Sequence, residues 1–300
     1  MELLSKAVPV TMLVFVVSSM LACGLSLRVM QILTPLRSIK LVSFALAANF
    51  IVIPIAAFGI SRLLRLDEPL AVALILLGTA AGAPFLPLLA RISKGDIAFS
   101  VGLMVLLMIV SVGYMPLILP FLLKGVSVDP LKIARSLVLL MMLPLAIGLI
   151  VKARFNSVAA RIQPLLNRVA SLTLVLLMSL LLITNIQNLL SLYGTRGVLA
   201  SVLFIGISTG FGWIMGGAGA STKAVMALGT AQRNIAAALV VGGQNFTDPR
   251  VVVMVVVVAI VGLLLLMPLA RFFGKKAEAF GGSESGLANG EGIMARGAGH

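Results

Sequence analysis

The residues best suited to chemistry form one short run, Gln232, Arg233 and Asn234, inside an otherwise apolar stretch at 224–243. If that stretch crosses a membrane, the arginine costs roughly 2.5–3.5 kcal/mol on insertion scales and needs a partner. Two interpretations of Arg233 stay open. It bonds the backbone carbonyls of a broken helix or reaches toward the membrane surface, or it holds an anionic substrate by two parallel hydrogen bonds.

No carboxylate is available inside the apolar stretches to pair with Arg233. The nine acidic residues all fall in predicted loops or chain ends: Glu2, Asp67, Glu68, Asp96, Asp129, Asp248, Glu278, Glu284 and Glu291. The missing partner of the arginine is therefore expected to be the anion that the protein binds.

A second stretch, 76–87, is unusual because it holds Gly78, Gly82, Pro84 and Pro87 near the middle of an apolar segment. Glycine and proline there make an uninterrupted helix unfavourable. Both unusual stretches carry Gly-Thr-Ala, at 78–80 and at 229–231. Paired interruptions at matching places in two halves are typical of transporters built from inverted repeats. The alternative is that the triplet recurs by chance and the prolines only bend the helix.

We predict that these spans break near 82–84 and 232–234 and that the breaks cross in space. Helix ends and free backbone amides at such a crossing can hold ions or carboxylates. The predicted substrate-binding residues come from both stretches: Arg233, Gln232, Asn234, Thr79, Thr230 and Pro84. The guanidinium is predicted to select an anion, and the amides to add neutral hydrogen bonds. No catalytic residue is predicted.

The elements that must position these residues follow from composition. Of the 300 residues, 60% are hydrophobic and 11% charged, against about 25% charged in soluble domains. A soluble chain cannot hide so much apolar surface, which excludes soluble enzymes and disordered proteins. The one cysteine, Cys23, excludes an internal disulfide, and the one histidine, His300, is the last residue. Neither a metal site nor a cofactor is expected, and sodium is the one ion considered below.

The sequence therefore predicts an all-α polytopic membrane protein of about nine transmembrane helices. The apolar runs are continuous and long enough to span as helix, and they do not alternate as barrel strands do. They lie at 7–27, 41–61, 70–90, 97–123, 133–151, 169–187, 198–219, 224–243 and 251–271. We expect a transmembrane domain over 1–273 and a disordered, glycine-rich tail over 274–300, because the tail has few residues to pack.

The net charge of +14 fits membrane topology better than nucleic-acid binding. Nine spans place fourteen of the 23 lysines and arginines on the side of the C-terminus and eight on the other side. The richer side is cytoplasmic by the positive-inside rule. We expect a bacterial-type inner membrane, with the N-terminus outside and the C-terminus cytoplasmic. The partners expected are the lipid bilayer and a small organic anion, and oligomeric state is left open.

Four stretches together resemble the bile acid:sodium symporter family: 11–27, 47–54, 78–101 and 232–239. The resemblance extends to about residue 273. It implies inverted repeats, a core domain with two crossing discontinuous helices, and a panel domain. Family members often have ten spans, and the resemblance implies that the first has no counterpart in these nine.

The resemblance carries the family's sodium ligands over only in part. A family Ser-Asn pair falls at Ala83-Pro84, and a family hydroxyl residue falls near Met104. The family glutamate that precedes the crossover glutamine falls near Leu228.

Three positions keep a polar group in the comparison with the family: Asn49, Ser100 and Gln232. They are the predicted ion-binding residues. Arg233, next to Gln232, adds a fixed positive charge that repels a second cation. We therefore expect that sodium does not bind with family-like affinity.

The predicted function is thus a secondary transporter or facilitator for a small organic anion, a carboxylate or bile-acid-like molecule. A sodium-coupled symporter with a modified ion site is the alternative. A membrane-embedded enzyme needs paired acids, histidines or a lysine inside the spans, and these stretches have none. A channel would be better served by rings of polar residues than by two broken helices.

Overall fold

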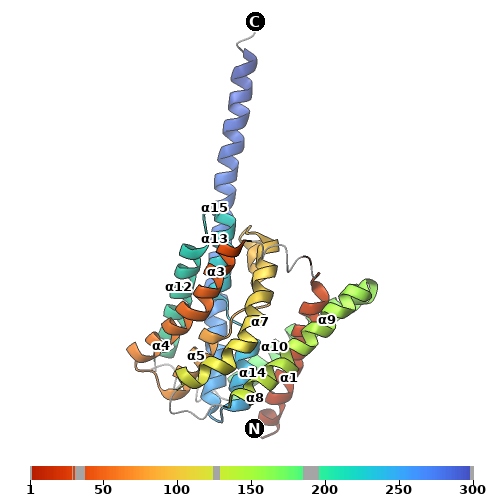
Figure 1. Ribbon diagram of the computed structural model, residues 1–300, viewed down its shortest axis with the longest axis vertical. Coiled ribbons are helices and arrows are strands. Elements are labelled where there is room, and N and C mark those ends of the chain that lie inside the picture. The colour runs from red at the N-terminus through yellow and green to blue at the C-terminus, as the bar shows by residue number, and fades with distance from the viewer. Residues whose placement is uncertain (1, 29, 31–37, 124–128, 185–195, 298–300) are drawn as a thin grey trace.

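The computed structural model describes residues 2–28, 30, 38–123, 129–184 and 196–297, and the elements in these ranges are all helical (Figure 1). They are α1 (Glu2–Ser26), α3 (Ile39–Ala47), η2 (Ala48–Val52), α4 (Ile53–Leu63), α5 (Glu68–Thr79), α6 (Leu86–Ile92), α7 (Ile97–Leu122), α8 (Pro130–Leu137), η3 (Val138–Met142), α9 (Leu143–Arg154), α10 (Asn156–Thr184), α12 (Gly197–Met215), α13 (Ala220–Ala231), α14 (Ile235–Asn245) and α15 (Pro249–Gly297).

Eight helical stretches in the described part of the chain are long and apolar enough to cross a membrane. Each corresponds to one of the predicted segments. The remaining segment, 70–90, is divided into the short helices α5 and α6. The all-helical, polytopic architecture predicted from composition is confirmed, and the protein is an integral membrane protein.

One predicted boundary is wrong. The sequence pattern places a connection from Lys152 to Arg168, but α10 begins at Asn156 and continues to Thr184. Hydropathy misses its first three turns because they carry Arg161, Gln163 and Asn167. Only 11% of the residues in the apolar window of α10 are buried, against 89% for α13 and α14. Helix α10 is therefore peripheral, and the second interrupted stretch lies at the centre of the bundle.

The helices form two groups. Helix α1 packs along α10 and α9, and we call α1, α8, η3, α9 and α10 the panel group. Helices α3–α7 and α12–α15 form the core group, in which α12 packs on α13, and α5 on α4 and α15. Figure 1 shows α1 and α9 on one side of the molecule and α3, α4 and α12 on the other. The inverted-repeat relation stays a prediction.

Within the panel group, α1 and α9 touch through their backbones. A Cβ added at Gly24 would lie 2.9 Å from the Cα of Gly148, and one added at Gly148 would lie equally close to the Cα of Gly24. Small residues at such crossings let helices approach closely in a membrane, where packing replaces the hydrophobic effect.

Two π-helical turns interrupt the second and fifth spans, and each comes just before a proline. Segment η2 precedes Pro54 and η3 precedes Pro144. Proline lacks the N–H that would bond the carbonyl four residues earlier, which is Phe50 for Pro54. The hydroxyl of Tyr114 donates to that carbonyl oxygen at 2.5 Å. A side chain from α7 thus satisfies the freed group and fixes the turn that carries Asn49.

Helix α15 continues along the chain to Gly297 and projects from the bundle at the end marked C in Figure 1. The boundary at residue 273 and the disordered tail beyond it stay predictions.

Candidate functional site

Both interrupted stretches are broken where the sequence predicts, and the breaks meet. Helix α5 ends at Thr79 and α6 begins at Leu86, while α13 ends at Ala231 and α14 begins at Ile235. The backbone N–H of Asn234 donates to the carbonyl of Ala80 at 2.9 Å. Its side-chain Nδ2 donates to the carbonyl of Gly82 at 3.0 Å.

Asn234 also starts the helix that follows it. Its Oδ1 accepts a hydrogen bond from the backbone N–H of Ala237 at 3.1 Å, the standard N-cap arrangement. One buried asparagine therefore joins the two breaks and caps α14. The first N–H groups of α14, at Ile235 and Ala236, have no partner within the helix.

The break between α5 and α6 needs glycine at position 82. Gly82 has φ +83°, in the left-handed region, and a Cβ there would lie 2.3 Å from the backbone N of Met108. Both the conformation and the close approach to α7 favour a residue without a side chain.

Helix α7 supports the same break through Ser111. The Ser111 hydroxyl accepts a hydrogen bond from the N–H of Ala81 at 2.9 Å and donates to the carbonyl of Ala81 at 3.1 Å. Ala81 is fully buried, and unwound backbone at membrane depth needs protein partners where it does not face a water-filled cavity.

Arg233 lies behind the crossing, with 3% of its surface exposed. Its Nε donates to the carbonyl of Leu77 at 2.8 Å and its Nη2 to the carbonyl of Gly78 at 2.7 Å. Its Nη1 donates to Asn49 Oδ1 at 2.7 Å and to the carbonyl of Thr230 at 3.1 Å. We call these four acceptors the oxygen cage.

The cage explains the repeated Gly-Thr-Ala triplet. Gly78 and Thr230 each belong to one triplet, and both carbonyls lie in the last turn of a half-helix. A guanidinium has five N–H groups, and four of them donate to the cage. One N–H, on Nη2, remains outside the cage in this structure, so two parallel bonds to a carboxylate would require Arg233 to leave part of the cage. Substrate binding by Arg233 stays a prediction. The other interpretation of Arg233, bonding to broken-helix carbonyls, describes the geometry.

Asn49 completes the cage from the core group. Its Oδ1 accepts from Arg233, while its Nδ2 donates to the carbonyl of Ala45 at 3.0 Å and to Thr230 Oγ1 at 3.4 Å. The amide is fully buried in the turn η2. Its oxygen and its nitrogen thus both have partners inside the core group, and its role as an ion ligand stays a prediction.

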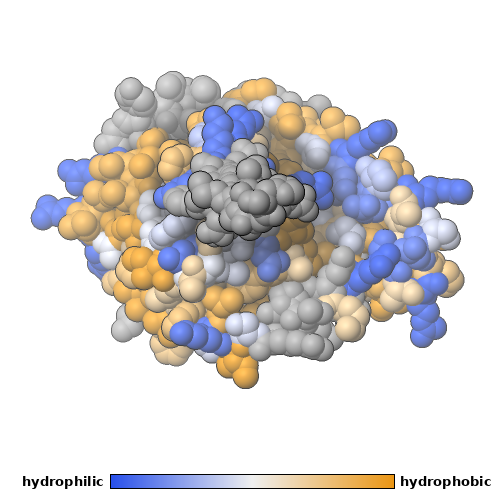
Figure 2. Space-filling view, turned by 90° about the horizontal axis from the view of Figure 1, so that it is seen from above, coloured by the Kyte–Doolittle hydropathy of each residue, from blue (hydrophilic) through white to orange (hydrophobic). Residues whose placement is uncertain are grey.

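A cavity of about 740 Å³ lies in front of the crossing, between the panel group and the core group. Gln232, Arg233, Asn234, Ile235 and Ala236 line it from the core, and residues of α1 and α10 line it from the panel. It reaches toward the end of the bundle where α1 ends and α10 begins. Figure 2 views the molecule from that end, where many hydrophilic residues, in blue, lie around the outer edge of the molecule.

The structure separates the predicted substrate-binding residues into two sets. Arg233, Gln232, Asn234 and Pro84 line the cavity. Thr79 and Thr230 are fully buried and are not among the lining residues. The Thr79 hydroxyl donates to the carbonyls of Ile75 and Leu76 within α5. These two threonines belong to the layer that supports the crossing.

The predicted ion-binding residues do not form one group in the described contacts. Asn49 is part of the oxygen cage, and Gln232 is half-buried at the cavity. Ser100 is buried and donates to the carbonyl of Ile97 in its own helix. Groups of three or more metal-binding side chains are absent from the part of the chain that the structure describes. Whether an ion or cofactor binds stays a prediction.

Several cavity and support residues are missed by sequence reasoning. Gln163 and Asn167 line the cavity from α10, one turn apart, and Arg91 lines it from α6. Gln163 and Asn167 lie four residues apart in the sequence, between the predicted segments 133–151 and 169–187. This helical spacing was the available signal for the two amides. For Ser111 and Tyr114 the signal was two polar residues three apart within an apolar span.

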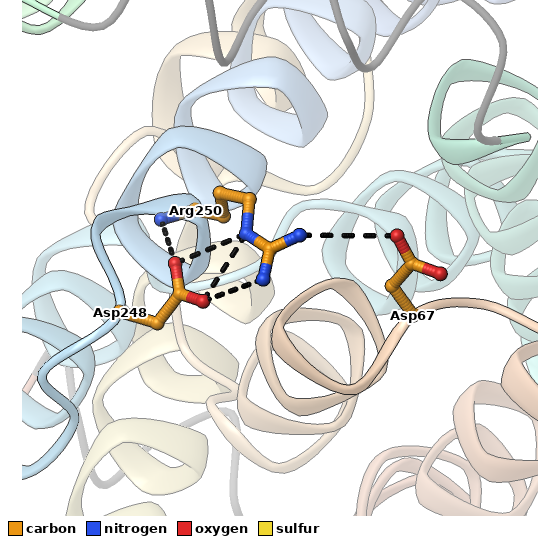
Figure 3. A network of polar contacts seen from close by, with 3 residues as sticks. All are labelled: Asp67, Asp248 and Arg250. Atoms are coloured by element: carbon orange, nitrogen blue, oxygen red, sulfur yellow. Dashed lines mark hydrogen bonds and ion pairs between the residues drawn. The ribbon is translucent and has the colours of Figure 1, made fainter.

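A second arginine site joins Arg250, Asp248 and Asp67 at the start of α15 (Figure 3). Arg250, at the start of α15, donates from Nη2 to Asp248 Oδ2 at 2.8 Å, and its Nη1 lies 3.9 Å from Asp67 Oδ2. The hydrogen bonds from Arg250 hold the pKa of Asp248 below its usual value. The side chains of Arg250, Asp67 and Asp248 are 37%, 57% and 34% exposed.

These features define a class: a polytopic helical membrane protein with two broken helices that cross beside a cavity between two helix groups. The family model described as "Sodium Bile acid symporter family" matches residues 11–192. The chain belongs to this family.

Curated relatives are similar to the chain at low identity. It is 24% identical over 263 residues to the chloroplastic "Probable sodium/metabolite cotransporter BASS1" of Arabidopsis thaliana, covering 86% of this chain and 65% of the relative. It is 27% identical over 198 residues to the "Uncharacterized sodium-dependent transporter YocS" of Bacillus subtilis, covering 66% and 60%. It is 28% identical over 156 residues to the rat "Hepatic sodium/bile acid cotransporter", covering 50% and 43%. The chain thus spans less than two thirds of the length of these relatives.

Proposed function

We propose that the protein is a secondary transporter or facilitator, not an enzyme, for a small organic anion such as a carboxylate or a bile-acid-like molecule. The single observation that carries this proposal is the cavity of about 740 Å³ beside the crossed breaks. Its volume is that of a small-molecule site. It lies between two helix groups, where a change in their relative position would alter access.

The charges around the cavity favour an anion. Arg91 and Arg233 are among the described residues that line it, and those lining residues include no carboxylate. Four of the five N–H groups of Arg233 donate to the oxygen cage, so Arg91 is the charge with its donors free of that cage. Gln163, Asn167 and Gln232 add amides, which can hydrogen-bond to a carboxylate and to neutral polar groups. The remaining lining is largely apolar, which suits the hydrocarbon part of an organic anion.

The helix ends add to this preference. Helix α14 begins at Ile235, and its N-terminal turn lines the cavity. A helix N-terminus carries about half a positive charge and unpaired N–H groups, and it binds anions. The C-terminal ends of α5 and α13 would repel an anion, but Arg233 bonds their carbonyls and compensates their negative charge.

We also propose that transport is not coupled to sodium. Leu228 stands where the resemblance places a family glutamate, and it is fully buried among apolar residues. A desolvated sodium ion needs several oxygen ligands and a compensating charge. The oxygens of the cage already accept hydrogen bonds from a cationic side chain.

Sodium-coupled symport is the second candidate, because two of the relatives are named as sodium cotransporters and one as a sodium-dependent transporter. We keep the orientation predicted from charge, with the C-terminus cytoplasmic, in either case. The cavity would then face the cytoplasm in this conformation.

The test is uptake of radiolabelled mono- and dicarboxylates and a bile acid into proteoliposomes, with sodium or choline as the external cation. Uptake that saturates and is equal in the two salts supports the proposal. Uptake that needs the sodium gradient selects the second candidate. Liposomes without protein control for diffusion of the protonated acids.

A further inference from the structure

The oxygen cage is a cation site by its chemistry. Its four acceptors are neutral oxygens, and three of them are backbone carbonyls of Leu77, Gly78 and Thr230 near the ends of two half-helices. Carbonyls in the last turn of a helix carry partial negative charge and lack the usual intrahelical partner. Of these three, the carbonyl of Leu77 also accepts a hydrogen bond from the N–H of Ala80 at 3.2 Å. Two such ends meet here in a buried place, so a positive charge between them is strongly favoured.

The cation in this cage is the guanidinium of Arg233, which is part of the protein chain. The N···O distances are 2.7–3.1 Å, and Nε, Nη1 and Nη2 all take part. The planar guanidinium matches acceptors that lie on three sides of it. Arg233 lies in the short non-helical break between α13 and α14, and its side chain reaches the cage from there.

We propose that Arg233 is a tethered cation: it fills a site that would bind a free monovalent cation if the side chain were removed. This inference rests on the proposed function in one respect, the absence of sodium coupling, for which it gives the physical reason. It goes further by assigning the cage itself as a binding site and stating its ligand. Guanidinium should bind the emptied cage better than sodium, because the acceptors stand at hydrogen-bond distances from nitrogen.

The experiment measures thermal unfolding of the purified full chain in detergent. Wild type, Arg233→Ala, Arg233→Lys and Arg196→Ala are compared at constant ionic strength, with choline chloride replaced stepwise by guanidinium chloride or sodium chloride. Concentrations stay below about 50 mM, where guanidinium denatures little. Arg196→Ala is the matched control, because Arg196 Nη1 also donates to a carbonyl beyond a helix end, that of Leu64, but at an exposed position.

Removing the side chain takes their donor from the buried carbonyls of Gly78 and Thr230 and from Asn49 Oδ1, so Arg233→Ala should lower the Tm by roughly 5 °C or more. Guanidinium should restore it along a saturating curve, as binding to the folded state requires. Sodium should give a smaller rise, and choline none. Wild type and Arg196→Ala should show no saturable rise with either cation.

Arg233→Lys keeps a cation in the cage but loses the planar fork. Its Tm should therefore lie between those of the wild type and Arg233→Ala, and it should not rise with guanidinium. This variant decides the matter if Arg233→Ala does not fold. The proposal is overturned if guanidinium stabilises the lysine variant or the wild type as much as Arg233→Ala, or if Arg233→Ala unfolds at the wild-type temperature. Because the readout is stability, a failure here is distinct from a failure to observe uptake of anions.

Discussion

The positive charges of Arg233 and Arg250, both in the core group, are compensated by different groups, because one side chain is buried and the other is partly exposed. Arg233, 3% exposed, is bonded by neutral oxygens and by no carboxylate within the described contacts. Arg250, with a side chain 37% exposed, is bonded by Asp248 and lies near Asp67 (Figure 3). The buried site uses helix ends, and the exposed site uses ionised side chains.

The difference follows from the cost of removing charge from water. A buried carboxylate would add its own desolvation penalty to that of the arginine. Backbone carbonyls at the ends of α5 and α13 are buried with or without the arginine and can accept its hydrogen bonds. They therefore compensate the guanidinium without the desolvation penalty of a second charged group. At the surface, solvent screens both charges, and an ion pair contributes about 0–1 kcal/mol.

The largest expected effect comes from Arg233→Gln. Losing a buried charge-assisted interaction costs on the order of 2–5 kcal/mol, so anion uptake should fall at least tenfold and the Tm should fall with it. Arg250→Gln is the matched change at the exposed site and should leave uptake within a factor of two or so. If Arg233→Gln folds normally and carries anions at the original rate, anion transport does not need a positive charge in the oxygen cage.

Gly82→Ala should come next. The new Cβ would lie 2.3 Å from the backbone N of Met108, and φ +83° disfavours alanine. We expect a loss on the order of 2–4 kcal/mol in unfolding free energy, because the backbone of the break around Gly82 must move away from α7. Gly59→Ala is the control, since no atom lies within 4 Å of its added Cβ. Equal stabilities of the two variants in chemical denaturation would show that the break tolerates another conformation.

Ser111→Ala should have a smaller effect, about 1–3 kcal/mol, because the N–H and C=O of Ala81 lose their partner in a buried place. Ser208→Ala is a suitable comparison, since the buried Ser208 hydroxyl donates only within its own helix, to Phe204. Uptake by Ser111→Ala should fall more than uptake by Ser208→Ala. The reverse order would mean that the first break does not need this support.

The smallest effect is expected at Asp248. Its pKa is lowered in the folded state by hydrogen bonds from Arg250, so its contribution is present above its unfolded pKa, near 3.9. That contribution is lost as the pH falls through the lower, folded value. Asp248→Asn should therefore lower the Tm slightly at pH 7. It should not lower the Tm at a pH so acid that Asp248 is protonated in both the folded and the unfolded state. A difference that grows at acid pH would contradict this sign.

Much of the fold could be predicted because the signals are local. Continuous apolar runs mark the spans, and Gly82, Pro84 and the polar run at 232–234 mark the breaks. Even the contact between the breaks follows from their paired positions. The start of α10 could not be predicted by hydropathy, because its first turns carry the polar residues that face the cavity.

The partners of Arg233 lay beyond sequence reasoning for a different reason. Carbonyl oxygens belong to every residue, so no residue type signals that Leu77 or Gly78 will accept a hydrogen bond from a guanidinium. The absence of acids within the spans was visible and gave two interpretations. Choosing between them required knowing where α5 and α13 end relative to each other.

The cavity has a further consequence for experiments on this protein. Cys23, the one cysteine in the sequence, lies in its wall on α1. A thiol reagent small enough to enter the cavity would therefore have a single position to label in this sequence, so no cysteine needs to be removed first. The rate of that labelling, and its slowing by bound substrate, would report how often the space between the panel group and the core group is open to solvent.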